Sequence, residues 1–121
     1  IYQFGIRAGT KDEFQYADKN TNMFKFEVFE PLKSVMKDIG ERPVYVTLDI
    51  DVLDPAFANG TGTPEPGGIS SKELIESVKL LKDLNLVGFD LVEVSPPYDD
   101  SDRTALAAAK VIREVILAVG R

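Results

Sequence analysis

Strand-like and helix-like segments alternate along the chain, and this alternation is the feature that most limits its possible folds. Three short segments rich in apolar, β-branched and aromatic residues are predicted to be strands: residues 2–7, 44–50 and 86–94. Three segments with apolar residues at helical spacing are predicted to be helices: residues 28–39, 70–84 and about 101–119. The order β-α-β-α-β-α predicts an α/β fold with a parallel sheet, and the nearly continuous apolar strands favour a sheet covered on both faces.

Local residue patterns support the ends of these helices. Ser70 and Glu73 have the spacing of a capping box at the start of the second helix. Gly120 is placed to end the third helix. We expect one apolar face on that helix, made of Leu106, Ala108, Val111, Ile112, Val115, Ile116 and Val119.

The predicted connections differ in length on the two edges of the sheet. The helix-to-strand turns are short, whereas the strand-to-helix connections span residues 8–27, 51–70 and 95–101. Ligands of open α/β sheets bind outside the carboxyl ends of the strands, where these long connections lie. Loops of this length are usually functional or disordered, and residues 8–27 fit either description.

The second predicted strand ends in acidic residues. Side chains alternate along a strand, so Asp49 and Asp51 are expected on one face, roughly 7 Å apart at Cα. Two carboxylates this close repel each other unless a cation lies between them, and carboxylate oxygens suit Mg²⁺, Mn²⁺ or Ca²⁺. Asp49 and Asp51 are therefore candidate metal ligands. Asp54, followed by Pro55, is expected to start a bend instead.

Two neighbouring features are candidates for binding a substrate. The GTGTPEPGG segment is expected to form a stiff wall that presents the hydroxyls of Thr61 and Thr63, although a merely tight connection is an equal alternative. Glu93 lies near the end of the third strand, where a carboxylate is able to bind a guanidinium by two hydrogen bonds. A charge satisfied by an arginine or a helix N-terminus is the alternative for Glu93.

The composition narrows the kinds of site. The 121 residues include no histidine and no cysteine, which removes disulfides, cysteine zinc sites and imidazole ligands or bases from this chain. A net charge of −6 without a basic cluster argues against nucleic acid or an anionic membrane as partner. No apolar run approaches the roughly 20 residues of a membrane span, and no leader-like segment is evident, so a cytoplasmic location is expected. Because the chain opens on Ile1 inside a predicted strand, we expect a piece of a longer protein.

The stretch TLDIDVLDPAFANGTGTPEPGG, residues 47–68, resembles the ureohydrolase family of agmatinase, arginase and their relatives. The resemblance continues through LKDLNLVGFDLVEVSPPYDDSDRTALAAAKVI and back to QFGIRAGT, and so covers nearly the whole chain. The D-x-D-x-x-D-P block followed by G-T-G-T-P is highly specific. DPAFANGTGTPEPGG and SPPYD are more similar to agmatinase than to arginase.

This resemblance implies a three-layer α/β/α fold with two Mn²⁺ ions at the carboxyl edge of the sheet. A metal-bridging hydroxide would hydrolyse the guanidinium of agmatine to urea and putrescine, a step of polyamine biosynthesis. By the same resemblance, Asp49 bridges both ions, Asp51 binds one of them, Glu93 pairs with the substrate guanidinium and Thr63 lines the substrate site. The full-length enzyme is expected to be a trimer or hexamer.

The chain departs from the family pattern in one small and one large respect. Asn59 stands where many relatives have proline. The family's remaining metal ligands, including histidines, come from an amino-terminal half, and none is present here. Residues 1–121 are therefore expected to be the carboxyl-terminal part of a single ureohydrolase domain, inactive without the rest.

Other functions remain open at this stage. Guanidinobutyrase, guanidinopropionase or arginase activity is the first alternative. A non-catalytic metal-binding or assembly module is the second. A metal-dependent phosphoryl-transfer domain is disfavoured, since the chain has no phosphate-binding loop.

Overall fold

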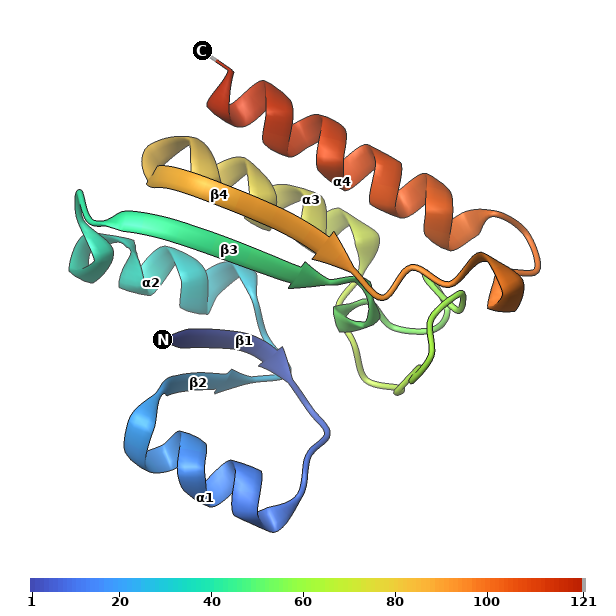
Figure 1. Cartoon of the computed structure of the whole chain (residues 1–121), viewed down its shortest axis with the longest axis horizontal. Coiled ribbons are helices and arrows are strands. Elements are labelled where there is room, and N and C mark those ends of the chain that lie inside the picture. The colour runs from blue at the N-terminus through green and yellow to red at the C-terminus, as the bar shows by residue number, and fades with distance from the viewer. Residues whose placement is uncertain (121) are drawn as a thin grey trace.

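The computed structural model describes residues 1–120, and these form four strands and four helices that alternate (Figure 1). In chain order they are β1 (Tyr2–Ile6), α1 (Lys11–Asn20), β2 (Asn22–Lys25), α2 (Phe29–Ile39), β3 (Pro43–Asp49), α3 (Ser71–Lys79), β4 (Asn85–Val92) and α4 (Arg103–Val119). Short 3-10 turns follow β3, α3 and β4. The predicted α/β class with parallel strands is confirmed.

The strands form two separate parallel pairs, not the single sheet that the sequence predicted. β1 pairs with β2, and β3 pairs with β4, with Val46 opposite Phe89 and Leu48 opposite Leu91. Figure 1 shows β1 and β3 running in the same direction, with β1 beside β3 but not joined to it. The connection from β2 through α2 to β3 therefore passes from one pair to the other.

Residues 8–27 were wrongly expected to be a loop, because they contain α1 and β2. Thr10 caps α1: its hydroxyl accepts from the Glu13 N–H, and the Glu13 carboxylate accepts from the Thr10 N–H at 2.6 Å. Only Ala17 of α1 is buried, so the helix has little of the apolar periodicity on which the prediction relied. This capping box was the sequence signal that would have revealed α1.

The main core lies between the β3–β4 pair and the helices α3 and α4. It contains Leu48, Leu74, Val78, Val111 and Val115, all less than a tenth exposed. Phe89 and Leu91 of β4 pack against this cluster. The opposite face of the pair carries Tyr45 and Val87, each 64% exposed, so in this chain helices cover only one face of the β3–β4 pair.

Helix α4 differs from its prediction in the direction of its apolar residues. Ala108, Val111 and Val115 face the core, but Leu106 and Ile116 are more than 60% exposed. The helix is thus apolar on more than one side, and the predicted single face was wrong. Among residues 1–120, no helix is long and apolar enough to cross a membrane.

Candidate functional site

The acidic end of β3 is shaped by a hydrogen bond from the backbone to Asp49. Asp49 is the last residue of the strand, and its Oδ1 accepts from the Asp51 N–H at 3.0 Å. This contact between residues two apart curls the chain into the 3-10 turn Ile50–Val52 and buries Ile50 completely. Ile50 is therefore not a strand residue, and strand alternation does not set the direction of Asp51 as predicted.

Asp51 and Thr63 are brought together across the loop. The Thr63 hydroxyl donates to Asp51 Oδ2 at 3.2 Å, although the two residues are twelve positions apart. Thr63 therefore lies beside a candidate metal ligand, on the exposed part of the loop. Thr61 does not share this position: it is 2% exposed, and its hydroxyl has no hydrogen-bond partner among the described residues. The expectation that Thr61 presents its hydroxyl on the wall was wrong.

Arg7, which the sequence analysis did not identify, binds the backbone of both the Asp51 turn and the loop that follows it. Its guanidinium donates to the carbonyl of Asp51 at 2.5 Å and to the carbonyl of Glu65 at 2.7 Å. A weaker contact reaches the carbonyl of Leu53 at 3.4 Å. One side chain from the end of β1 thus ties the turn that carries Asp51 to the loop that carries Thr63. Arginine is suited to this because its planar group donates in several directions at once.

Glu93 lies one residue beyond β4, not within it. Its backbone is left-handed, with φ of 67°, a conformation that non-glycine residues rarely adopt and that is often found at functional sites. The predicted strand to residue 94 was therefore too long. Glu93 is exposed, whereas Phe89 and Leu91 of β4 pack against the core.

The surroundings of Asp49 disfavour the charged form of its carboxyl. Partial burial raises the pKa of its carboxyl above the ordinary value, and the charges of Asp51 and Glu93 raise it further. The hydrogen bond from the Asp51 N–H opposes them. The pairing of Asp49 with Val92 places the end of β4 beside the end of β3. The neighbouring carboxylates of Asp49 and Asp51 favour a bound cation.

The loop between β3 and α3 is held in shape by Asp54, which starts the bend as predicted. Its two carboxylate oxygens accept from the N–H groups of Ala56 and Gly67, each at 2.9 Å. These bonds lower the pKa of Asp54. Gly68 allows the closing contact, since a side chain there would lie 2.4 Å from the Asp54 nitrogen. Hydrogen bonds therefore hold the loop beside Thr63 in shape.

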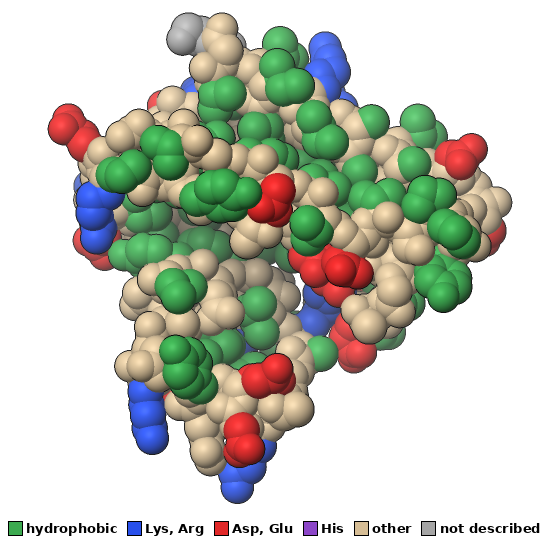
Figure 2. All heavy atoms as spheres, in the orientation of Figure 1, with side chains coloured by type: hydrophobic (Ala, Val, Ile, Leu, Met, Phe, Trp, Pro, Cys, Tyr) green, Lys and Arg blue, Asp and Glu red, His purple; other side chains and the backbone are tan. Residues whose placement is uncertain are grey.

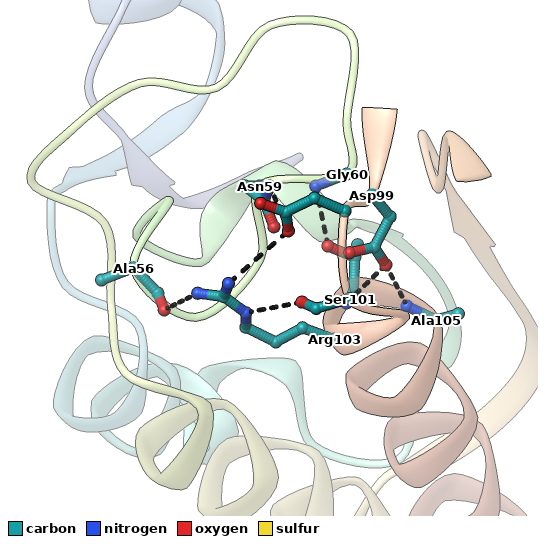
Figure 3. Close-up of polar contacts among 9 residues, drawn as sticks. Ala56, Asn59, Gly60, Asp99, Ser101, Arg103 and Ala105 are labelled. Atoms are coloured by element: carbon teal, nitrogen blue, oxygen red, sulfur yellow. Dashed lines mark hydrogen bonds and ion pairs between the residues drawn. The ribbon is translucent and has the colours of Figure 1, made fainter. Parts of the chain in front are cut away.

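A second set of contacts joins this loop to the start of α4 (Figure 3). The Asp99 carboxylate accepts from the N–H groups of Thr104 and Ala105, at 2.8 and 3.2 Å, and so satisfies the free end of α4. The Thr104 hydroxyl in turn accepts from the Gly60 N–H at 2.8 Å.

The side chain at the family's proline position also takes part in this junction. Asn59 donates to Asp100 at 3.1 Å. This contact joins the loop after β3 to the segment after β4, so the departure at Asn59 has a structural use here.

The residues of this chain fit part of a metal centre. Asp49 and Asp51 supply the oxygen ligands that Mn²⁺ accepts. Within residues 1–120, no group of three or more histidine, cysteine, aspartate or glutamate side chains is placed to hold an ion.

Comparison with known proteins identifies the family. Residues 1–118 match the model of the arginase family. The chain belongs to this family. It is 58% identical over 120 residues to the agmatinase of Halalkalibacterium halodurans and 56% identical over 120 residues to that of Bacillus subtilis. These matches cover 97% of this chain but 42% and 41% of the relatives.

A solved structure shares the fold of this arginase-family chain. The proclavaminate amidino hydrolase of Streptomyces clavuligerus superposes with a TM-score of 0.89 at 38% identity, over 97% of this chain and 42% of that one. The predicted resemblance to ureohydrolases, and the fold class with it, is thereby confirmed. The chain spans about two fifths of the length of each of these relatives.

Proposed function

We propose that this chain is part of an agmatinase-like ureohydrolase. The whole protein would hydrolyse agmatine to urea and putrescine. The observation that carries the proposal is the pair of carboxylates, Asp49 and Asp51, at the end of β3 in a chain 58% identical to an agmatinase. Carboxylates are complementary to two kinds of cation, a metal ion and a guanidinium. In this role the protein would act in the cytoplasm as a homo-oligomer.

The carboxylates of Asp49 and Asp51 have a proposed role as metal ligands. Asp49 and Asp51 would hold the manganese, because both stand where the strand ends and neither is paired with a basic side chain in the described residues. When bound, manganese lowers the pKa of water enough to provide hydroxide near neutral pH.

The substrate would be oriented by side chains on either side of the carboxylates. Glu93 is exposed and turned out of its strand, which suits a bidentate contact with a guanidinium. Thr63, already bonded to Asp51, would border the space that the guanidinium enters. Arg7 would act at a distance, as a positioning residue for the Asp51 turn.

A chimera tests this function without requiring activity from the chain alone. In it, this chain replaces the 120 residues that it matches in the agmatinase of Bacillus subtilis. We expect urea release from agmatine in the presence of Mn²⁺. The Asp49→Asn variant should abolish it, and Glu93→Gln should lower kcat/KM by roughly 10²–10³-fold. Asp83→Asn, on the exposed turn after α3, is the matched control.

Urea release from four substrates, agmatine, guanidinobutyrate, guanidinopropionate and arginine, separates the alternative functions. Faster urea release from guanidinobutyrate, guanidinopropionate or arginine than from agmatine would assign another amidinohydrolase. A well-folded chimera inactive on all four would support a non-catalytic module. Activity that survives Asp49→Asn would refute the assignment of the site. Urea release from this chain alone would show that the missing ligands are not needed.

A further inference from the structure

Thr104, the second residue of α4, is completely buried and takes part in two hydrogen bonds. Its N–H donates to the Asp99 carboxylate at 2.8 Å, which is an ordinary way to satisfy the first turn of a helix. Its hydroxyl accepts from the N–H of Gly60 at 2.8 Å, although Gly60 lies 44 positions earlier in the chain. Because Asp99 already caps the helix, the bond to Gly60 serves the loop after β3 and not α4.

Gly60 is held by contacts on all sides. Its C=O accepts from the Ser95 N–H at 2.8 Å, while its N–H donates to Thr104. A Cβ added at Gly60 would lie 2.5 Å from the Cβ of Asp99 and 3.0 Å from the Oγ1 of Thr104, so only glycine permits this close approach. Figure 3 shows Gly60 and Asp99 next to each other. One point of the loop is thus fixed both to the segment after β4 and to the first turn of α4.

This fixed point lies between the two residues proposed to meet the substrate. Ser95, which binds Gly60, comes two residues after Glu93, and Gly60 comes three residues before Thr63. The loop passes beside the Glu93 carboxylate, because a Cβ added at Gly62 would lie 3.7 Å from Glu93 Oε2. Figure 2 shows acidic side chains gathered at the carboxyl ends of β3 and β4. The position of Gly60 therefore sets how far Thr63 stands from Glu93.

The candidate metal ligands have a support of their own. The Asp51 carbonyl accepts from Arg7 at 2.5 Å, and the Asp51 N–H donates to Asp49 at 3.0 Å. Neither bond involves Thr104. The contact from the Thr63 hydroxyl to Asp51 is longer, at 3.2 Å, and lies on the exposed part of the loop. A change at Thr104 should therefore disturb the substrate side of the site more than the metal side.

We propose that Thr104 is a positioning residue for the substrate. Through Gly60, it holds the loop that carries Thr63 at the distance from Glu93 that a bound guanidinium requires. A guanidinium that makes two hydrogen bonds to a carboxylate tolerates little displacement of its surroundings, so a small shift of the loop should weaken substrate binding. This inference rests on the proposed ureohydrolase function for its effect on catalysis, whereas the contact between α4 and the loop belongs to this chain.

Steady-state kinetics of the Bacillus subtilis chimera test the proposal. Thr104→Val keeps the shape of the side chain but removes the hydroxyl that accepts from Gly60. We expect KM for agmatine to rise about tenfold, while kcat and the Mn²⁺ concentration for half-maximal activity change by less than about threefold. Thr104→Ser keeps the hydroxyl and should keep the KM of the parent chimera. A Thr104→Val chimera with unchanged KM would overturn the proposal.

Val111→Ala separates positioning from a general loss of stability. Val111 is 1% exposed on the inner side of α4, so its truncation leaves a cavity beneath the same helix. This variant of the chimera should unfold more readily than the parent but keep its KM for agmatine. A rise in KM equal to that of Thr104→Val would show that any weakening of α4 has this effect, and the specific role of Thr104 would be wrong.

Amide hydrogen exchange in the chimera tests the contact independently of the reaction. In Thr104→Val, the amides of Gly60 and Ser95 should exchange about tenfold faster, because the two bonds at Gly60 support each other. In Thr104→Ser they should exchange as in the parent. The Asp51 amide, which is bound to Asp49, is the internal comparison. Unchanged exchange at Ser95 would refute the role of Thr104, whereas a chimera inactive on all four guanidino substrates would refute the proposed function.

Discussion

Arg7 joins three segments that are far apart in the sequence, and its loss should be felt across the site. Its guanidinium bonds the carbonyls of Asp51 and Glu65 at 2.5 and 2.7 Å. Lysine keeps the charge but not the planar set of donors. We expect Arg7→Lys to lower the free energy of unfolding of this chain by about 1–3 kcal/mol, measured by urea denaturation.

The matched control is Arg113→Lys. Arg113 lies on the exposed side of α4 and contacts only Glu114 among the ion pairs found, at 3.2 Å. Exposed pairs of this kind contribute at most about 1 kcal/mol. Equal stability of the Arg7 and Arg113 variants would show that Arg7 does not hold the loop.

Asp90 should make stability depend on pH. Its carboxylate accepts from the hydroxyls of Tyr45 and Thr47 at 2.7 and 2.6 Å. Hydrogen bonds from Thr47 and then Tyr45 lower the pKa of Asp90 below its ordinary value of 3.8. Because the folded pKa is the lower one, the stabilisation is present above the unfolded pKa and is lost as the pH falls through the folded pKa.

Asp90→Asn should therefore be less stable than the parent near neutral pH, and this difference should shrink as the pH falls from about 6 to about 3. Urea denaturation at a series of pH values measures it. In a Tyr45→Phe/Thr47→Val background, the pH-dependent part should disappear. A difference that stays constant with pH would contradict the role given to these hydrogen bonds.

Single residues also show where sequence reasoning about the site succeeds and fails. The pattern of acids at strand ends located Asp49, Asp51 and Glu93, because strand ends are marked by composition. It did not contain what sets their geometry. That is a side-chain-to-backbone bond at Asp49, which curls the chain at Asp51, and a left-handed backbone at Glu93.

At the scale of elements, capping residues decide where helices begin. The Ser70 hydroxyl accepts from the Glu73 N–H at 3.1 Å and caps α3, as its sequence pattern predicted. We expect Ser70→Ala to cost about 1 kcal/mol of unfolding free energy. Ser71→Ala, at the first helical position, removes a hydroxyl with no capping role and should change stability by less than about 0.5 kcal/mol. Equal losses in the two variants would contradict the cap.

Helices α1 and α3 show the limits of periodicity as a guide. Both begin with a hydroxyl residue three positions before a glutamate. α3 was predicted because its apolar residues reach the core, and α1 was not because only Ala17 does. The strand that follows α1, β2, has four residues and pairs with β1 over its length. It is too short to be recognised from composition. The local capping box begins α1, whereas β2 depends on its pairing with β1.

At the scale of the whole molecule, strand order was beyond what the sequence could supply. Alternation of strands and helices predicts a parallel arrangement, but it does not say which strands are neighbours. Within residues 1–120, β1 pairs with β2 and β3 pairs with β4, and no pairing joins β1 to β3.

The outer side of α4 should govern how this chain associates with itself. Leu106 and Ile116 are 68% and 61% exposed, and Ile112, Leu117 and Val119 add to the same helix. Exposed apolar groups in such number are typical of surfaces that another protein or domain covers. We expect Leu106→Lys/Ile116→Lys to reduce concentration-dependent light scattering of the isolated chain, with a change in unfolding free energy of no more than about 0.5 kcal/mol per substitution.

Two further variants make this test specific. Val111→Lys, at a position 1% exposed on the inner side of α4, should unfold the chain, because it would bury an unpaired charge. Val87→Lys, on the uncovered face of the β3–β4 pair, tests whether that face rather than α4 is the contact. If Val87→Lys abolishes the scattering and the α4 variant does not, association proceeds through the bare sheet face, and the exposed side of α4 is not the contact.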